Sequence, residues 1–90
     1  MTARTLAQQV LDRGKSMSAR QYSWFRSMAE NDSTISVEWQ GNYPCCYFYL
    51  TDGRMVSVEQ SYQTYGGARL SISSSVIADA AEIAAAVAAA

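Results

Sequence analysis

Apolar residues recur at helical spacing in the first third of the chain and at every second position in its middle. Residues 2–13 carry apolar side chains three and four positions apart, and Gly14 follows where helix C-termini favour glycine. Ser18 and Gln21 have the spacing of a capping box, so a second helix is predicted to begin at Ser18 and to continue to residue 31. We expect the two helices to form a hairpin.

The second predicted helix and the alanine-rich end of the chain each carry an apolar face. Trp24 and Phe25 supply the large side chains of the second helix, and we expect both to be buried against a sheet or another helix. Near the end of the chain, Val76, Ile83 and Val87 fall on one stripe among many alanines. Alanine is the best helix former, so a third, closely packed helix is predicted there.

In the middle of the chain the hydrophobic period changes to two, which is typical of strands. The segments that alternate in this way are residues 34–40, 42–50 and 55–60. Turn signals separate them, with Gly41-Asn42 after the first segment and Asp52-Gly53 after the second. Leu70 and Ile72 indicate a fourth, short strand, which we expect Ser73–Ser75 to end.

These elements predict a two-layer α+β fold in the order ααββββα, with an N-terminal helical hairpin, a four-stranded antiparallel sheet and a C-terminal alanine-rich helix. The chain has 90 residues, of which 49% are hydrophobic and 17% charged, as expected for one globular domain over residues 1–90. The predicted inner face of the sheet consists of Ile35, Val37, Trp39, Cys46, Phe48, Leu50, Val56, Val58, Leu70 and Ile72.

Alternation in the second strand places Tyr43, Tyr47 and Tyr49 on one face and Cys46, Phe48 and Leu50 on the other. Such a strand is either buried on both sides or presents an aromatic row to a partner, and the sequence leaves both alternatives open. Exposed tyrosines are typical of protein-binding surfaces. The candidate partner-binding residues are Glu38, Tyr43, Tyr47, Tyr49, Glu59 and Arg69, together with Tyr62 and Tyr65 in the loop before the fourth strand.

Charge is distributed unevenly along the chain. Residues 1–30 hold five cationic and two anionic side chains, whereas residues 31–90 hold two and six, and the net charge is -1. Candidate phosphate contacts in the helical part are Arg13, Lys15, Arg20 and Arg26. The acidic sheet part lacks the basic footprint of a protein that neutralises many phosphates. The alternative to protein binding is a module that stacks single-stranded nucleic acid or a nucleotide on the tyrosines.

The composition favours a protein without catalytic, metal or cofactor chemistry. The chain has no histidine and one lysine, so Cys45, the conceivable nucleophile, lacks a usual base partner. Cys45 and Cys46 are adjacent, so a bond between them would be strained, and reduced thiols indicate a cytoplasmic location. Neither an export signal nor a membrane segment is expected.

The segment Leu11–Trp24 resembles a helix-hairpin pattern of phage-encoded accessory proteins, in which glycine, serine, glutamine and tryptophan recur at similar spacing. The resemblance implies a mobile-element origin and transfers no functional residue. In size and type the chain is similar to anti-CRISPR and other anti-defence proteins. That similarity implies an inhibitor that occludes a host protein or nucleoprotein complex in the host cytoplasm; homodimerisation is a further expectation.

Overall fold

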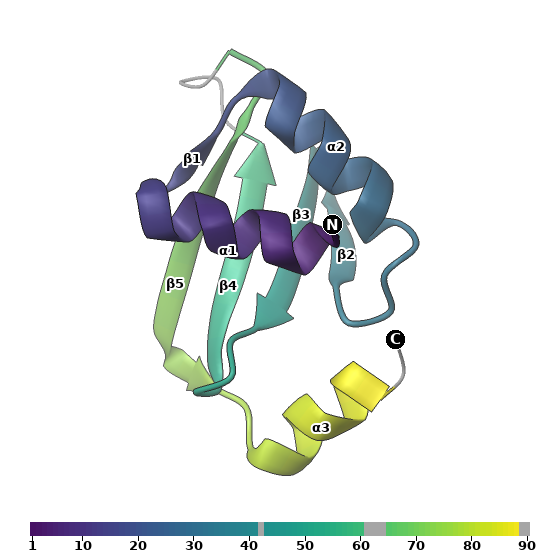
Figure 1. Cartoon of the computed structure of the whole chain (residues 1–90), viewed down its shortest axis with the longest axis vertical. Helices are drawn as coiled ribbons and strands as arrows, with labels where there is room; N and C mark the ends of the chain where they lie inside the picture. The colour runs from purple at the N-terminus through teal and green to yellow at the C-terminus, as the bar shows by residue number, and fades with distance from the viewer. Residues whose placement is uncertain (42, 61–64, 89–90) are drawn as a thin grey trace.

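Two helices cover one face of an antiparallel sheet in the computed structural model, which describes residues 1–41, 43–60 and 65–88 (Figure 1). The elements are α1 (Ala3–Arg13), β1 (Ser16–Met17), α2 (Ala19–Ala29), β2 (Ser36–Gln40), β3 (Tyr43–Tyr49), β4 (Arg54–Gln60), β5 (Ala68–Ile77) and α3 (Ala80–Ala88). The strand order is β1-β5-β4-β3-β2, and all neighbours are antiparallel. The predicted two-layer α+β class is confirmed.

Capping residues begin both N-terminal helices, and the second helix begins where its predicted capping box places it. The Thr2 hydroxyl accepts a hydrogen bond from the Thr5 backbone N–H at 3.1 Å and caps α1. Ser18 and Gln21 form a complete capping box at the start of α2, with bonds of 3.0 and 3.2 Å between side chains and backbone N–H groups. These bonds satisfy backbone donors that have no partner inside the helix.

The core lies between the two helices and the inner face of the sheet. Phe25 of α2 meets Phe48, Val56, Val58 and Leu70 of the sheet, and each of these side chains is at most 1% exposed. Complete burial of such a side chain stabilises the fold by about 1.5–3 kcal/mol. The helical layer and the sheet therefore depend on each other for stability.

Both tryptophans are exposed, which corrects the prediction that they belong to the core. Trp24 is 54% exposed on the side of α2 that faces away from the sheet, and Trp39 is 62% exposed on the edge strand β2. An arginine stacks on each ring: the Arg20 guanidinium lies 5.3 Å from the Trp24 ring centroid, and that of Arg26 lies 5.4 Å from Trp39. Each exposed tryptophan ring thus has an arginine as its cation–π partner.

The two-residue strand β1 was absent from the predicted fold. Ser16 and Met17 pair with Arg69 and Ala68 of β5, in the connection between α1 and α2. Gly67 makes this approach possible, because a Cβ at that position would collide with the Met17 carbonyl. A strand of two residues is too short to produce a detectable period.

β5 is longer than predicted. Ser73–Ser75 lie within the strand, and Val76 belongs to β5 instead of to a helix. The register changes from Met55↔Ser73 to Arg54↔Ile77, so the strand contains an irregularity over the serines. The prediction was wrong because a strand with a bulge does not keep a period of two.

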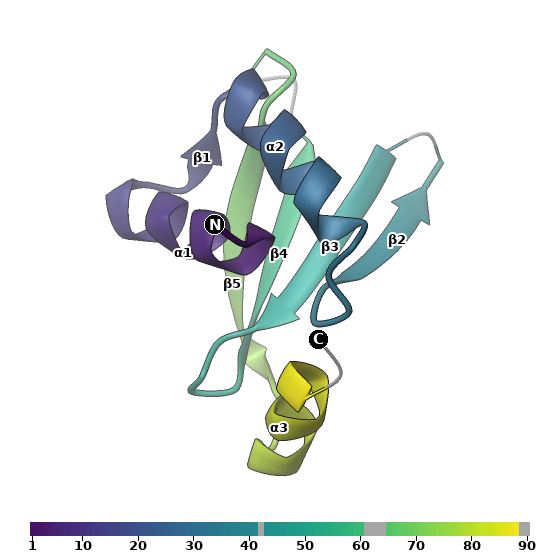
Figure 2. The same ribbon diagram turned by 45° about the vertical axis from the view of Figure 1, so that its right-hand side comes forward.

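α3 begins at Ala80, later than predicted, and Asp79 accepts a hydrogen bond from the Glu82 backbone N–H at 2.8 Å. The prediction of close packing is wrong for residues 80–85, where Ile83 is half-buried and the other side chains are exposed. Figures 1 and 2 show α3 at the end of the sheet, away from both of its faces. Within the described part of the chain, no helix has the length and apolar character needed to span a membrane.

Candidate binding surface

The sheet face opposite α1 and α2, here called the open face, collects most of the predicted site residues. Side chains alternate along each strand, so the register decides which residues share this face. One row across four strands consists of Glu38, Cys45, Glu59 and Arg69. The next row contains Ser36, Tyr47, Ser57 and Ser71, and the row after it contains Tyr49, Met55 and Ser73. Tyr43 lies on the same face at the start of β3.

The described residues place no helix over the open face. Figures 1 and 2 show α1 and α2 on the other side of the sheet. Tyr43 is 45% exposed, and Tyr47 and Tyr49 are half-buried. Glu38, Glu59 and Arg69 are exposed. Of the two alternatives for the tyrosine row, the structure therefore shows the one in which the row faces solvent.

A groove with a volume of about 420 Å³ runs along one end of the open face. Its lining comes from the loop before β2 and from β2, β3 and β4, and consists of Ser33, Thr34, Ser36, Glu38, Tyr47, Phe48, Tyr49 and Met55. Glu38 is the charged residue of this lining. The volume lies within the range of about 300–1,000 Å³ that ligand pockets have.

Cys45 is 3% exposed although it lies on the open face. Its thiol donates a hydrogen bond to Glu59 Oε1 over 3.6 Å, and Glu38 and Glu59 are its direct neighbours on the two flanking strands. Burial raises the pKa of the Cys45 thiol, and the two carboxylates raise it further. A hydrogen bond to Cys45 is the main cause that raises the pKa of Tyr47 to about 12. Cys45 is therefore a protonated donor and not an activated nucleophile at neutral pH.

Metal chemistry has no support in the described residues. They contain no group of three or more histidine, cysteine, aspartate or glutamate side chains arranged to hold a metal ion. Both cysteines are free thiols, as the sequence predicts. Cys46 lies on the inner face, where burial raises its pKa to about 11. Both thiols serve as small buried groups in the packing of the sheet.

The predicted phosphate contacts lie in the helical part, away from the tyrosines. Arg20 stacks on Trp24, and Arg26 stacks on Trp39 and forms an ion pair with Glu30 at 3.3 Å. Arg13 and Lys15 are exposed at and after the end of α1. The cations and the open-face tyrosines therefore do not form one surface.

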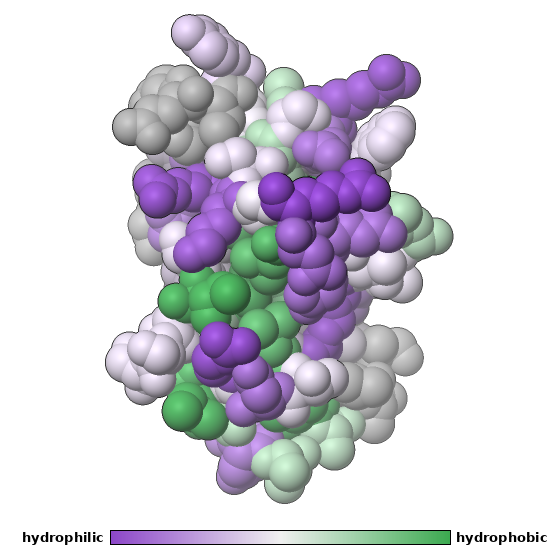
Figure 3. Space-filling model, turned by 60° about the vertical axis from the view of Figure 1, so that its left-hand side comes forward, coloured by the Kyte–Doolittle hydropathy of each residue, from purple (hydrophilic) through white to green (hydrophobic). Residues whose placement is uncertain are grey.

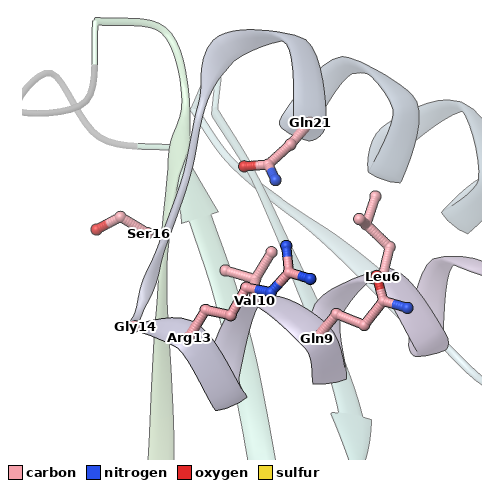
Figure 4. A pocket seen from close by; sticks show the side chains of 7 residues that line it. All are labelled: Leu6, Gln9, Val10, Arg13, Gly14, Ser16 and Gln21. Carbon is pink, nitrogen blue, oxygen red and sulfur yellow. The ribbon is translucent and has the colours of Figure 1, made fainter.

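Arg13 also borders a small pocket between α1, β1 and the start of α2 (Figure 4). Its volume is about 100 Å³, below the size of typical ligand pockets. The side-chain oxygen of Gln21, which borders the same pocket, already accepts a hydrogen bond from the Ser18 N–H. This pocket therefore provides no phosphate site.

The loop tyrosines stand apart from the open face. Tyr62 lies outside the described residues. Tyr65 is 92% exposed in the turn before β5, outside the strand register that defines the open face. Its neighbour Gly66 faces Ala19 at the start of α2, so Tyr65 is presented at that end of the molecule.

Two structural features near the groove could not be predicted from the sequence. Arg4 of α1 donates a hydrogen bond to the Tyr49 carbonyl, and its guanidinium lies 5.5 Å from the Phe48 ring centroid. Thr34 joins the groove lining from the loop before β2. These contacts depend on where the helix and the loop cross the sheet, and no local pattern in the sequence signals them.

Comparisons of this chain with protein-family models, curated proteins and solved structures find no match. No relative therefore assigns a role to the open face.

Proposed function

We propose that this protein is a non-enzymatic binding protein that captures a basic segment of a partner protein on its open face. The observation that carries the proposal is the uncovered groove in which Tyr47 and Tyr49 lie beside Glu38. In the phage-encoded setting implied by the resemblance of residues 11–24, such binding would inhibit a host complex by occluding the captured segment.

The tyrosines favour a protein partner. A tyrosine ring offers a large apolar area with a polar tip and has only two side-chain torsions to order on binding. Tyr47 and Tyr49 are already half-buried between their strand neighbours, and the Arg4 bond to the Tyr49 carbonyl anchors this end of β3. A surface that is ordered before binding loses less entropy when the partner arrives.

The charges favour a cationic side chain in the groove. Glu38 supplies a carboxylate to a groove that two tyrosines also line, a combination that attracts arginine or lysine through an ion pair and cation–π contacts. Glu59 lies in the same row as Glu38, and Arg69 lies at the far end of that row, beside Glu59. Phosphates would approach these carboxylates unfavourably, so the nucleic-acid alternative has less support.

The experiment compares matched variants in partner capture. Tagged protein is mixed with nuclease-treated lysate of a bacterial host at moderate salt, and bound proteins are identified by mass spectrometry. The double variant Tyr47→Ala/Tyr49→Ala should reduce capture by at least about tenfold, as expected when central aromatic contacts are lost. Trp24→Ala removes an exposed aromatic side chain from the helical side and should leave capture unchanged.

A charge substitution tests the chemistry of the partner. Glu38→Lys should abolish capture of a basic segment, whereas Glu38→Gln should weaken it less because the side chain keeps its shape. Capture that survives the tyrosine double variant, or that is lost in Trp24→Ala instead, would contradict the proposal. Material that binds from untreated lysate but not from nuclease-treated lysate, and whose binding falls steeply with salt, would support the nucleic-acid alternative.

A further inference from the structure

The outer edge of β2 is open to a further strand. β2 pairs with β3 along all five of its residues, Ser36–Gln40, in one unbroken register. None of the described residues pairs with β2 on its other side, and Figures 1 and 2 show this strand at the margin of the sheet. A regular edge strand presents backbone N–H and C=O groups on which an extended peptide can form a further strand.

The opposite edge of the sheet, along β5, is not suited to strand addition. β1 already covers Ala68 and Arg69, and the register with β4 breaks between Arg54 and Met55, which leaves an irregularity in β5. Figure 3, which brings that side of the molecule forward, shows hydrophobic side chains confined to a strip between hydrophilic ones. A bulged strand does not continue a regular ladder, so β2 is the edge that can receive one.

The open-face side of β2 is suited to a cationic side chain. Glu38 is exposed there and lines the groove. Ser36 lies between the edge of the sheet and Tyr47, which is its direct partner on β3. Because serine is small, a long cationic side chain from an added strand can lie over Ser36 and reach the groove. An aliphatic or acidic side chain would find no charge partner in Glu38.

The inner-face side of β2 is suited to an apolar side chain. Val37 is half-buried and packs against the core, and Trp39 is 62% exposed although Arg26 stacks on its ring. An added strand would cover part of this aromatic area and so gain apolar burial. Successive side chains of a strand point to opposite faces, so a complementary segment alternates cationic and apolar residues.

The chain that leads into β2 is held in place before binding. Asp32 Oδ1 accepts hydrogen bonds from the Thr34 backbone N–H at 2.9 Å and from the Thr34 hydroxyl at 2.6 Å. The Ile35 N–H donates to the Asp32 carbonyl at 3.1 Å, and the Ile35 side chain is buried. An edge that is already ordered loses less entropy when a further strand pairs with it.

We propose that the captured segment of the partner binds as a strand added to β2, with cationic side chains beside Glu38 and apolar ones against Trp39. This mode of binding rests on the proposed function, since it specifies how the segment occupies the groove. Glu38 is the central residue of Ser36–Gln40, so two-fold antiparallel pairing with a second copy would bring two carboxylates together. The charge of the edge therefore selects a basic segment over a second copy.

Fluorescence anisotropy with labelled peptides tests the alternation. The probe is a short synthetic peptide in which valines alternate with threonines and one arginine replaces the central threonine. A peptide of the same composition without the alternation should bind at least about tenfold more weakly, because its side chains cannot meet both faces of β2 in the required order. Glutamate in place of the arginine should abolish binding. Equal binding of the ordered and reordered peptides, or no saturable binding of the probe, overturns the proposal.

Backbone methylation of the probe tests the strand pairing itself. In an added strand only every second N–H points toward β2. Two peptides, methylated on alternate sets of backbone nitrogens, should therefore differ: one should lose at least about tenfold in affinity and the other should bind like the parent. Binding that requires Tyr47 and Tyr49 but responds equally to both methylation patterns would overturn strand addition alone and leave the proposed function standing.

Matched variants of the protein locate the edge. Ser36→Lys places a like charge in the path of the arginine and should weaken binding of the probe by at least about tenfold. Ser71→Lys makes the same change in the same row on β5 and should leave binding unchanged. Trp39→Ala should also weaken binding by about tenfold, whereas Trp24→Ala should not. Circular dichroism checks that each variant is folded.

Two results with these variants overturn the proposal. The first is a loss of affinity in Ser71→Lys as large as that in Ser36→Lys, which would show that binding depends on net charge and not on the β2 edge. The second is a wild-type dimer in sedimentation velocity that Ser36→Lys dissociates, which would show that a second copy occupies this edge.

Discussion

The two faces of β3 have similar hydrophobic character but different surroundings. Phe48 is 1% exposed beneath the helical layer, whereas its neighbours Tyr47 and Tyr49 are half-buried on the open face. Stability is concentrated on the covered face, where apolar side chains are removed from water completely. The open face keeps part of its aromatic area available, so the same alternation of side chains supports folding on one side and binding on the other.

The adjacent residues Cys45 and Cys46 also differ in their surroundings, because they lie on opposite faces of β3. Both are nearly inaccessible, at 3% for Cys45 and 1% for Cys46. Cys46 is covered by the core of the inner face, whereas Cys45 lies on the open face between Glu38, Tyr47 and Glu59. Burial on the open face is therefore local, and it comes from side chains of the sheet itself.

The largest expected effect comes from truncating the covered face. Phe48→Ala should lower the free energy of unfolding by about 3–5 kcal/mol, because it removes a fully buried ring and leaves a cavity. Tyr47→Ala on the open face should lower it by about 1 kcal/mol, a typical value for a partly exposed site. Urea unfolding of both variants gives the comparison. Equal losses would show that the tyrosine row is part of the core.

Alkaline pH should destabilise the fold through the covered thiol. Burial raises the pKa of Cys46 from about 9.0 to about 11, so between these values the unfolded chain loses a proton that the folded chain keeps. The stability contribution is complete below pH 9.0 and is lost as pH rises through 11. Burial also raises the pKa of Tyr22, whose effect has the same sign.

The measurement is the melting temperature as a function of pH. Wild-type protein should lose stability steadily across this alkaline range, and Cys46→Ala should show a shallower decline. Cys45→Ala is the comparison on the open face, and it should also make the decline shallower because burial raises the pKa of this thiol in the same direction. A profile that Cys46→Ala leaves unchanged would show that the inner-face thiol does not cause the decline.

A smaller effect on stability is expected from the capping box at the start of α2. Ser18→Ala removes the hydroxyl that accepts a hydrogen bond from the Gln21 backbone N–H and should lower the free energy of unfolding by about 1 kcal/mol. Ser23→Ala, at an exposed position within α2, is the control and should have no such cost. The difference is read from paired denaturant curves. Equal behaviour of the two variants would mean that α2 is held by packing alone.

Local signals in the chain were sufficient for most elements. The capping box at Ser18, the glycine after the first helix and the Asp52-Gly53 turn all lie where the structure uses them. The alternation of residues 43–49 correctly predicted which side chains of β3 share a face. Such signals act through bonds and torsions between residues that are close in sequence, so they can be recognised without knowledge of the tertiary fold.

Long-range placement could not be predicted in the same way. Trp39 has the periodicity of an inner-face residue, yet it lies on the edge strand β2, is 62% exposed, and has only the Arg26 side chain of α2 among the described residues stacked on its ring. β1 pairs with β5 only because Gly67 admits the Met17 carbonyl. Each feature depends on strand order and on contacts between distant residues.

The sequence by itself determined the α+β class, the starts of the first two helices and the alternation that separates tyrosines from core residues, because these follow from short-range geometry and from side-chain period. The tertiary structure decided which sheet face the helices cover, how the row of Glu38, Cys45 and Glu59 assembles, and how β1 pairs with β5. Those outcomes depend on how much apolar surface each arrangement buries, and that quantity belongs to the whole fold.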